Sequence, residues 1–431
     1  MRTGDTIMAL SSGALPAGVA VIRLSGPRVR AVLETLAAPV PPARTMALRQ
    51  IRHDGRSLDQ GLVVHFPAPG SFTGEDCAEL HVHGSNAGVR AILAVLASLD
   101  VRLAEAGEFT RRAFENGKLD MLEVEGLGDL INADTEKQRQ QALARYDGAL
   151  TRAVMAWRDT LLDLRAEIEA RLDFSDEGDV SEGLPAEWHD TLGALKASIA
   201  KALSSVDSGR VVREGIRVAV AGAPNAGKSS LINALSRSDV AIVSDEAGTT
   251  RDVREVPLDI GGQLFLLLDL AGLRETESKA EAEGVRRAAN AIETADIVLW
   301  LVAPDQADVP KPEMTGQVLT VHTKTDLKSA AAGATAVSSE TGAGLPSLLE
   351  KLQELGEQLT GQEPSLVSHA RDRNALSAAI DALEDATRHW NDWELAAEAL
   401  RSASAALERM IGSLDAEQVL DRLFSSFCIG K

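Results

Sequence analysis

The chain has 431 residues, too many for one compact hydrophobic core, so we expect two to four domains. Hydrophobic residues make up 45% of the chain and charged residues 25%. The sequence has no run of eighteen apolar residues, no secretion-type leader and only two cysteines. We therefore expect a cytoplasmic protein rather than a membrane or disulfide-rich one. A net charge of −20, with scattered Lys and Arg, argues against a protein that binds nucleic acid through a basic face of its own.

Residues 1–118 are expected to form an α+β domain, because short β-rich runs alternate there with helical patterns. The expected strands are 19–24, 61–66 and 78–83, and the expected helices are 29–36 and 87–96. By spacing alone, Arg23 and Glu79 in this segment are ordinary strand-end charges.

Helical patterns fill residues 119–212 and return in residues 362–431, on either side of a segment of different character. Each helical stretch alone would leave an apolar stripe uncovered, so we expect the two stretches to combine into one discontinuous bundle. The segment between them, residues 213–361, is then a domain inserted into that bundle. Residues 360–365, around its end, have the composition of a linker.

The inserted segment contains the most informative motif, Gly222-Ala-Pro-Asn-Ala-Gly-Lys-Ser-Ser230, between an apolar strand at 216–220 and a helical pattern at 231–235. Strand, glycine loop and helix in this order are the context of a phosphate-binding P-loop. Its backbone N–H groups turn inward around a phosphate, and the positive end of the helix adds to the attraction. We expect Lys228 to reach the β- and γ-phosphates of a nucleotide, and the Ser229 hydroxyl to bind Mg²⁺.

Three further polar segments follow apolar strands, which places them at the edge where open α/β sheets bind ligands. They are Asp269-Leu-Ala-Gly272 after 264–268, Thr323-Lys-Thr-Asp326 after 318–321, and Ser338-Ser-Glu-Thr-Gly342 after 334–337. The Asp326 carboxylate is suited to accept hydrogen bonds from N1 and the 2-amino group of guanine, a donor pair that adenine lacks. The order of these segments predicts a Ras-like P-loop domain that binds a guanine nucleotide.

Hydrolysis of the nucleotide requires a residue that orients water, and the usual glutamine after Asp-x-x-Gly is replaced here by Leu273. Glu281 and Glu283 lie in the polar segment 274–284 and are candidates, although a solvated acidic loop is the plainer interpretation of that segment. The residues themselves leave the choice between the two glutamates open.

Charge on the transferring phosphoryl group must also be neutralised, and an alkali cation is a candidate. Asn225, inside the P-loop, offers a side-chain carbonyl oxygen to a monovalent cation beside the phosphates. The segment Ser244-Asp-Glu-Ala-Gly-Thr-Thr250 offers hydroxyl and backbone oxygens to the same ion, and Thr250 would then remain for Mg²⁺.

Several motifs together resemble the MnmE (TrmE) family of tRNA-modification GTPases, and the resemblance covers essentially the whole chain. Residues 244–252, with Gly-Thr-Thr-Arg-Asp, look like the family's potassium-binding loop, and Cys428-Ile-Gly-Lys431 looks like its C-terminal signature. The segments similar to the family's folate-binding domain are Asp5-Thr-Ile7, Val21-Ile-Arg-Leu-Ser-Gly26, Ser71-Phe-Thr-Gly-Glu-Asp76, Gly107-Glu-Phe-Thr110 and Asn116-Gly-Lys-Leu-Asp120. P-loops are common, but their combination with this C-terminus is highly specific.

The resemblance implies a set of site residues, position by position. The implied Mg²⁺ ligands are Ser229 and Thr250, and the implied K⁺ ligands are Asn225, Ser244, Thr249 and a backbone carbonyl near Glu246. The residues implied to bind GTP are Asn225, Ala226, Gly227, Lys228, Ser229, Ser230, Ser244, Thr249, Thr250, Asp269, Gly272, Thr323, Lys324, Asp326, Ser338 and Ser339. The implied folate contacts are Arg23, Glu79, Lys118 and Lys431. Glu281 is implied to orient water through a second water molecule, and Cys428 is the motif cysteine, without an assigned role.

Three positions depart from the family pattern. Thr323 replaces the usual Asn, which removes an amide that braces the P-loop and predicts a lowered nucleotide affinity. Leu270 replaces a usual Thr, a change of packing more than of chemistry, and Ser244 replaces another Thr while keeping its hydroxyl.

By this resemblance the chain would be a K⁺-stimulated GTP hydrolase, and residues 1–118 would bind folate. It would form a homodimer through both this N-terminal domain and the GTPase domain. With the FAD-containing partner MnmG (GidA), it would form 5-carboxymethylaminomethyl or 5-aminomethyl groups on wobble uridine 34 of tRNAs, using 5-formyl- or methylene-tetrahydrofolate. The partner would supply much of the tRNA binding, in line with the acidic charge. Two alternatives stay open: a ribosome-assembly GTPase of the related Era or EngA type, and a scaffold that binds GTP but hydrolyses it negligibly.

Overall fold

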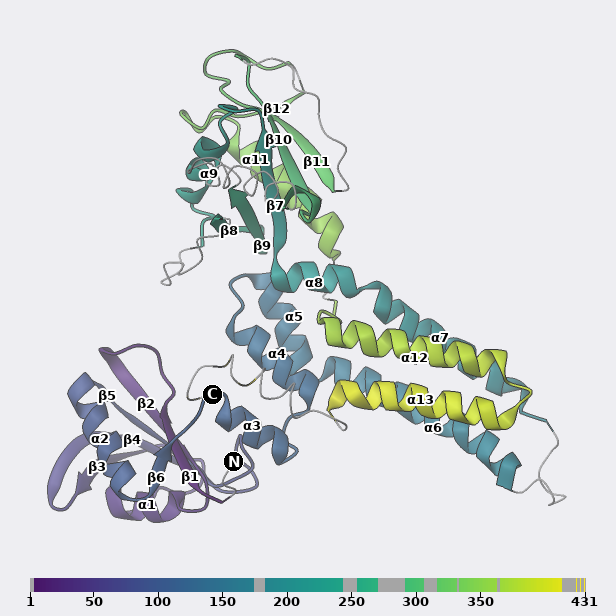
Figure 1. Ribbon diagram of the computed structural model, residues 1–431. Coiled ribbons are helices and arrows are strands. Elements are labelled where there is room, and N and C mark those ends of the chain that lie inside the picture. Colours follow the sequence, from purple (N-terminus) through teal and green to yellow (C-terminus); the bar gives the residue numbers. More distant parts are fainter. Residues whose placement is uncertain are drawn as a thin grey trace, which may run out of the picture. The chain divides into compact units, whose positions relative to one another are not determined.

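The computed structural model describes residues 4–173, 183–242, 254–269, 291–305, 316–331, 333–362 and 365–412, together with 424, 427 and 430. By contacts between residues the chain divides into two compact units. Unit 1 consists of Met1–Gly128 and Glu408–Lys431, and unit 2 consists of Asp129–Leu407 (Figure 1). The two ends of the sequence therefore belong to the same unit, and the domain boundaries expected from the sequence remain predictions.

Unit 1 is built on a six-stranded mixed sheet with the strand order β3-β4-β5-β2-β1-β6. Its strands are β1 (Thr6–Leu10), β2 (Ala17–Ser25), β3 (Ala47–His53), β4 (Arg56–Phe66), β5 (Cys77–Gly84) and β6 (Val101–Leu103). Neighbouring strands are antiparallel, except that β1 and β6 run parallel. The α+β class expected for the N-terminal part is confirmed.

One face of this sheet carries the main aliphatic core of unit 1. Successive side chains of a strand point to opposite faces, so alternate residues of β2 and β5 supply this core. Helices α1 (Val29–Leu36) and α2 (Asn86–Ser98) cover it, and Ile22 and Leu80 between them are fully buried.

The opposite face carries a smaller apolar cluster. Ile7 and Ala9 of β1 lie there with Phe109, which belongs to helix α3 (Glu108–Glu115), and Phe72 packs against them. This cluster leaves room beside β2 and β5 for polar side chains, so that the second face is the one able to hold a ligand.

Residues from the C-terminal end of the chain lie against unit 1. The carbonyl oxygen of Gly430 accepts a hydrogen bond from the Ser11 hydroxyl at 2.9 Å. A Cβ atom on Gly107 would lie 2.7 Å from the carbonyl oxygen of Phe424, and Gly107 has a φ of 66°. Glycine at position 107 is therefore required both by this close approach and by its left-handed backbone.

Unit 2 combines helices from both sides of the inserted segment. The helices are α5 (Glu136–Tyr146), α6 (Ala149–Asp173), α7 (Ala186–Ser204), α8 (Val206–Glu214), α12 (Ala370–Arg388) and α13 (Trp393–Ile411). The two divisions between the units fall within α4 (Met121–Ile131) and near the end of α13. Helix α7 packs against both α6 and α12, with Leu161, Leu192 and Leu383 buried (Figure 1). Arg145 Nη1 of α5 lies 2.8 Å from Asp372 Oδ2 of α12, and neither side chain is exposed. The two helical stretches thus form one discontinuous bundle, as expected.

The inserted segment forms a second six-stranded sheet with the strand order β12-β11-β10-β7-β9-β8. Its strands are β7 (Ile216–Gly222), β8 (Arg254–Ile260), β9 (Gln263–Asp269), β10 (Ile297–Val302), β11 (Gln317–His322) and β12 (Thr335–Ala336), and helices α9 (Lys228–Ser236) and α11 (Leu345–Thr360) accompany them. All neighbouring pairs are parallel except β8 and β9. The carboxyl ends of the parallel strands therefore meet at one edge, as expected for a P-loop domain.

Helix α5 presents a polar stripe to the places where the chain passes between the bundle and this sheet. The Gln138 amide donates to the carbonyl oxygen of Arg213 at 2.9 Å. The Gln141 amide donates to the carbonyl oxygens of Gly209 at 3.1 Å and Ser365 at 2.7 Å. Gly209 and Arg213 precede the sheet and Ser365 follows it. Helix α5 therefore forms hydrogen bonds to both segments that connect the bundle to the sheet.

Lys137 of α5 contacts the sheet itself. Its Nζ atom donates to the Thr360 hydroxyl at 3.0 Å, and its backbone N–H donates to the carbonyl oxygen of Gly262 at 3.0 Å. Burial lowers the pKa of Lys137, against the opposing effect of Glu357. The bundle therefore holds the inserted domain through directional hydrogen bonds as well as through apolar packing.

Candidate functional site

The P-loop lies where the sequence predicts it, between β7 and α9. Strand β7 ends at Gly222, the helix begins at Lys228, and Gly227 between them has a φ of 92°. The Lys228 Nζ atom donates to the carbonyl oxygens of Gly222 at 3.0 Å and Ala223 at 2.9 Å. The ammonium group is thus held at the mouth of its own loop, where phosphate oxygens could replace these carbonyls.

The side chains of the P-loop that are expected to meet a nucleotide are accessible. Asn225, Ser229 and Ser230 are exposed, whereas Ala226 is fully buried. Asn225 has a φ of 63°, a left-handed conformation that Asn tolerates better than most residues. Amide and hydroxyl oxygens are ligands that hard cations prefer, so Asn225 and Ser229 fit the K⁺ and Mg²⁺ assigned to them.

Thr323, directly after β11, corrects one expectation. Its hydroxyl donates a 2.7 Å hydrogen bond to the carbonyl oxygen of Ala226 in the P-loop, and the residue is only 3% exposed. The expected loss of a brace at this position was therefore wrong, because a hydroxyl supports the loop in place of the usual amide. The effect of Thr323 on nucleotide affinity remains a prediction.

Asp326, the residue expected to select guanine, is oriented by a neighbouring loop. Its Oδ1 atom accepts a hydrogen bond from the hydroxyl of Ser338 at 2.6 Å, and Ser338 is fully buried. Lys324 has a φ of 54°, and its Nζ atom lies 2.8 Å from Asp305 Oδ2. Ser339 is half-buried next to Ser338. The loops after β11 and β12 are thus brought together at the same edge as the P-loop.

Part of the expected nucleotide site lies outside the described residues. Asp269 ends β9, which pairs with the P-loop strand β7, and only its backbone is described. The expected residues that fall outside are Ser244, Glu246, Thr249, Thr250, Leu270, Gly272, Leu273, Glu281 and Glu283. Their roles therefore remain predictions.

A second candidate site is a cavity of about 210 Å³ in unit 1. Arg23 of β2, Glu79 of β5 and Phe72 of the loop between β4 and β5 line it. Arg23 Nε and Nη2 both donate to Glu79 Oε1, at 3.1 and 3.0 Å, and the guanidinium carbon lies 5.9 Å from the centre of the Phe72 ring. Two residues that look ordinary by spacing are therefore paired in one concave, partly aromatic site.

Lys118, the third expected folate contact, lies beside the wall of this cavity. It is exposed, and a Cβ atom on Gly74 would lie 3.3 Å from its Cε atom. Gly74 belongs to the same loop as Phe72, so the lysine stands next to the segment that lines the cavity.

The C-terminal residues Cys428 and Lys431 lie outside the described residues, but Gly430 is anchored at Ser11. In the antiparallel pair of β1 and β2, Arg23 lies opposite Ala9, which is two positions before Ser11. At the rise of an extended strand this separation is about 7 Å. Gly430 therefore lies near the register position of Arg23.

The cavity also has lining residues that the motifs did not single out as ligand contacts. They are Arg44, Phe66, Gly70, Ser71, Phe72, Thr73 and Cys77. Cys77 is a free thiol and is 5% exposed. Residues two apart on a strand share a face, so Cys77 could have been placed beside Glu79 once β5 was assigned.

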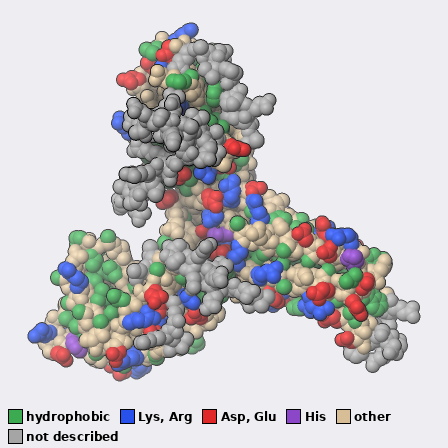
Figure 2. Space-filling view, viewed as in Figure 1, with side chains coloured by type: hydrophobic (Ala, Val, Ile, Leu, Met, Phe, Trp, Pro, Cys, Tyr) green, Lys and Arg blue, Asp and Glu red, His purple; other side chains and the backbone are tan. Residues whose placement is uncertain are grey.

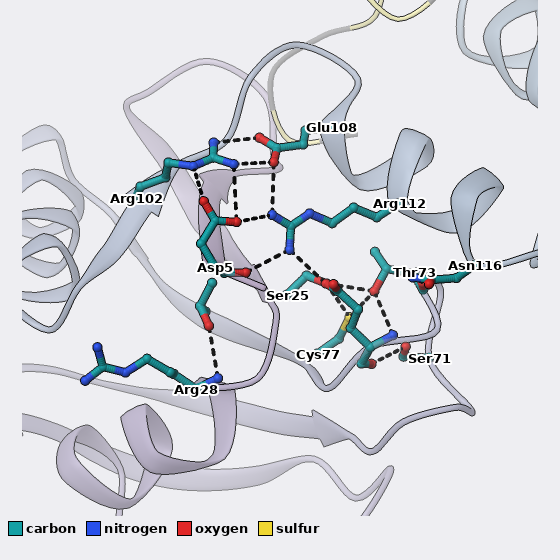
Figure 3. Close-up of polar contacts among 12 residues, drawn as sticks. Asp5, Ser25, Arg28, Ser71, Thr73, Cys77, Arg102, Glu108, Arg112 and Asn116 are labelled. Carbon is teal, nitrogen blue, oxygen red and sulfur yellow. Dashed lines mark hydrogen bonds and ion pairs between the residues drawn. The ribbon is translucent and has the colours of Figure 1, made fainter. Parts of the chain in front are cut away.

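A partly buried ionic network centres on Arg112 of α3 (Figure 3). Arg112 Nη1 donates to Glu75 Oε2 at 2.9 Å and to the carbonyl oxygen of Asp5 at 3.0 Å. Its Nη2 atom donates to Asp5 Oδ1 at 2.7 Å and to Glu108 Oε1 at 3.0 Å. Arg102 bridges the same pair from the other side, donating to Asp5 Oδ2 at 2.7 Å and to Glu108 Oε2 at 2.8 Å.

This network keeps two of its carboxylates ionised. Burial alone would raise the pKa of Glu108, but hydrogen bonds from Arg102, the Glu105 backbone and Arg112 outweigh it and hold the pKa below its ordinary value. The pKa of Asp5 is lowered in the same way, with burial again outweighed by its hydrogen bonds to the two arginines. The network is thus a set of charge-assisted hydrogen bonds at neutral pH.

The described surface carries both signs of charge. On the face that Figure 2 shows, Lys and Arg side chains are intermixed with Asp and Glu rather than gathered over one element. Unit 1 also exposes apolar side chains, among them Val19, Leu48 and Leu62. Among the helices that the structure describes, none combines the length and the apolar composition needed to cross a bilayer.

Comparison with known proteins agrees with this geometry. The family model for the GTP-binding protein TrmE N-terminus matches residues 6–118, and that for the MnmE helical domain matches residues 121–428. The chain is 48% identical to the tRNA modification GTPase MnmE of Azorhizobium caulinodans over 436 residues and to that of Methylobacterium radiotolerans over 441 residues, in both cases across 100% of each chain. The G domain of the T. maritima FeoB iron transporter matches 32% of this chain and 98% of its own at 28% identity, with a TM-score of 0.24 that is too low to bear on function. The chain belongs to the MnmE (TrmE) family.

Proposed function

We propose that this chain is a K⁺-stimulated GTP hydrolase that acts in tRNA modification in the cytoplasm. The observation that carries the proposal is the 48% identity to a named tRNA modification GTPase over the full length of both chains. A P-loop and a Thr-Lys-x-Asp segment at one edge of a parallel sheet support it independently.

Lys228 and Asp326 would hold the two ends of GTP. Lys228 would exchange the loop carbonyls that it now contacts for β- and γ-phosphate oxygens, while the P-loop amides and the start of α9 stabilise developing negative charge. Asp326, oriented by Ser338, would accept the N1 and 2-amino hydrogens of guanine. Glu281 would orient the attacking water through a second water molecule.

The cation ligands follow from the same set of residues. We assign Mg²⁺ to Ser229 and Thr250, and K⁺ to Asn225, Ser244, Thr249 and the carbonyl oxygen of Glu246. When bound, these ions would supply positive charge beside the phosphates, a role that an arginine finger has in other GTPases. The exposure of Asn225 and Ser229 in the P-loop supports the assignment.

The cavity of unit 1 would take a reduced folate. Its volume of about 210 Å³ is below the roughly 300–1,000 Å³ of pockets for drug-sized ligands, so we expect it to hold the bicyclic head group and not the glutamate tail. Glu79 could accept hydrogen bonds from the ring amines, and Phe72 offers an aromatic surface. Lys118 and Lys431 would then be available to the anionic tail.

Partners complete the proposed reaction. With the FAD-containing MnmG (GidA), the chain would form 5-carboxymethylaminomethyl or 5-aminomethyl groups on wobble uridine 34, and the partner would provide much of the tRNA binding. A homodimer through residues 1–118 would cover apolar side chains that unit 1 exposes, which are Val19, Met46, Leu48, Leu62 and Leu103. Residues 119–212 and 362–431 would be the helical domain and residues 213–361 the GTPase domain.

The test combines two measurements on the purified full chain with one in a strain that lacks it. Phosphate release from GTP should be several-fold faster in K⁺ than in Na⁺, and the chain should bind 5-formyltetrahydrofolate in equilibrium dialysis. Mass spectrometry of wobble uridines in a strain that lacks the chain should show recovery of the modified base only when the intact gene is supplied. A gene truncated before Lys431 is the matched control and should restore less.

The two alternatives give different results. A ribosome-assembly GTPase of the Era or EngA type would hydrolyse GTP but bind no reduced folate. A nucleotide-gated scaffold would bind GTP and release phosphate at the same near-zero rate in either cation.

A further inference from the structure

Five short segments that stand out in the N-terminal sequence meet around one side chain, that of Arg112 (Figure 3). They contribute Asp5, Ser25, Glu75, Glu108 and Asn116 to one hydrogen-bonded network. None of these five side chains lines the cavity of unit 1, although the loop that they hold does. We propose that Arg112 is a positioning residue that fixes the loop 70–76 and so shapes the cavity for a reduced folate. The inference rests on the folate binding proposed above.

The link from Arg112 to the cavity runs through Glu75. The Glu75 carboxylate accepts from Arg112 at 2.9 Å, and its backbone N–H donates to the Thr73 hydroxyl at 3.2 Å. The Ser71 hydroxyl donates to the backbone carbonyl of Glu75. Because Ser71 and Thr73 both line the cavity, a displacement of Glu75 would move the cavity wall.

A second set of hydrogen bonds connects the Arg112 network to the same wall of the cavity. The Ser25 hydroxyl donates to Glu75 Oε2 at 2.6 Å and lies 2.7 Å from the Thr73 hydroxyl. The Thr73 hydroxyl is in turn 3.1 Å from the Cys77 thiol, another lining group. Asn116 donates to the Thr73 carbonyl at 2.7 Å, two residues before Lys118. The loop position therefore affects Lys118 as well as the cavity.

Arginine is required at position 112 for geometric reasons. Its planar fork contacts carboxylates from three separate segments, those of Asp5, Glu75 and Glu108, and its side chain is 8% exposed. A lysine would keep the charge, but as a compact point charge it cannot satisfy three directions at once. Arg112→Lys therefore keeps the positive charge and removes the geometry of the guanidinium contacts, so it tests the geometry alone.

The main core of unit 1 does not depend on this link. The aliphatic core against α1 and α2 lies on the other face of the sheet. Glu108 and Asp5 also remain paired with Arg102 when Arg112 is replaced. We therefore expect Arg112→Lys to fold, with its effect concentrated in the loop 70–76.

The first measurement is calorimetric titration of the full chain with 5-formyltetrahydrofolate. For Arg112→Lys we expect the Kd to rise about tenfold, the factor that corresponds to loss of one charge-assisted hydrogen bond. The rate of GTP hydrolysis in K⁺ should stay within twofold of the unaltered chain. Arg30→Lys is the matched control, because Arg30 forms an exposed pair with Glu34 at 3.2 Å and should change neither quantity.

The second measurement does not need folate. Amide hydrogen exchange of peptides that cover residues 70–76 should be faster in Arg112→Lys than in the unaltered chain or in Arg30→Lys. Glu75→Gln should produce the same changes, and the double variant should add little, because both replacements remove the same link. If Arg112→Lys does not fold, Glu75→Gln carries the test by itself.

The outcomes distinguish two kinds of failure. If the unaltered chain binds the folate and both variants show unchanged affinity and exchange, the inference about Arg112 is overturned and the proposed function stands. If the unaltered chain binds no reduced folate, the proposed function fails and this inference fails with it.

Discussion

Two regions of the molecule, the nucleotide edge of unit 2 and the cavity of unit 1, are built in opposite ways. The nucleotide edge is the edge of the second sheet at which the P-loop and the loops after β11 and β12 lie. At the nucleotide edge, Lys228, Asp326 and Ser338 each lie in a short segment that follows a parallel strand. The cavity takes Arg23 and Glu79 from neighbouring antiparallel strands, and the network beside it joins residues 107 positions apart in the sequence. A parallel sheet gathers strand ends at one edge, so local sequence can specify a site there. A site on the face of an antiparallel sheet takes residues from several strands, so it can be located only when the pairing register of those strands is known.

The largest expected effect tests whether the two units are independent of each other. Arg145→Met removes the 2.8 Å partner of the buried Asp372 carboxylate and leaves it with Arg371, whose Nη2 atom lies 3.7 Å from Oδ1. The free energy of unfolding of unit 2 should fall by up to about 3–5 kcal/mol. All five tryptophans, Trp157, Trp188, Trp300, Trp390 and Trp393, belong to unit 2, so tryptophan fluorescence during urea denaturation measures this unit.

The double variant Arg145→Met with Asp372→Leu is the control and should recover most of the loss, since no charge remains buried. The affinity for a reduced folate, which we propose that unit 1 binds, should not change in either variant. A fall in folate affinity would show that the two regions are not independent.

The next effect concerns the nucleotide edge alone. Lys228→Ala removes the ammonium group at the mouth of the P-loop, and we expect GTP hydrolysis to fall by about 10²–10³-fold, as when one group that stabilises the transition state is lost. Steady-state phosphate release measures it. Lys201→Ala on the exposed side of α7 should leave the rate unchanged. Loss of folate binding in Lys228→Ala would contradict the separation of the two sites.

Lowering the pH should destabilise unit 1 through its ionic network around Arg112, and so distinguish the two regions. The folded-state pKa values of Asp5 and Glu108 lie below their ordinary values of 3.8 and 4.5. Their contribution to stability is therefore complete above those ordinary values, and it is lost as the pH falls from them through the lower folded-state values. Amide exchange of unit 1 peptides, divided by the intrinsic exchange rate at each pH and followed from pH 5 downward, should rise in this window. Glu108→Gln should flatten the pH dependence, and an unchanged slope would contradict the prediction.

The smallest expected effect concerns the brace beneath the P-loop. Thr323→Ala removes the hydroxyl that donates to Ala226, and we expect GDP affinity to fall about three- to tenfold, in line with about 0.5–1.5 kcal/mol for a hydrogen bond. Thr323→Asn restores a donor of the usual kind and should bind GDP within twofold of the unaltered chain. Fluorescence titration with a labelled GDP measures both, and equal affinity of all three chains would show that the brace has no role.

Sequence reasoning served the nucleotide edge well, because its information is local. The strands that end at Gly222, Asp269 and His322 were predicted from apolar runs, and each is followed by its polar segment. It failed at Thr323, where a residue type was compared with a family pattern without the distance to Ala226. A hydroxyl within 2.7 Å of that carbonyl does what a longer amide would do.

The cavity was less predictable for a physical reason. Asp5, Glu75 and Arg112 belong to motifs or segments that look unrelated in the sequence, and only the sheet register and the position of α3 bring them together. Helix α5 presents a similar difficulty. Gln138 and Gln141 form a polar stripe that by pattern would face solvent, yet both are buried against backbone carbonyls.

The contacts of α5 have a consequence for how such a chain can be taken apart. One Gln141 amide reaches the carbonyl oxygens of both Gly209 and Ser365, so these two atoms are no more than about 6 Å apart. The GTPase portion is therefore a cassette attached through adjacent stems, the arrangement in which insertion and excision of a domain are tolerated. A few glycines joining residue 209 to residue 365 should close the gap and leave a shortened helical protein that folds without any nucleotide.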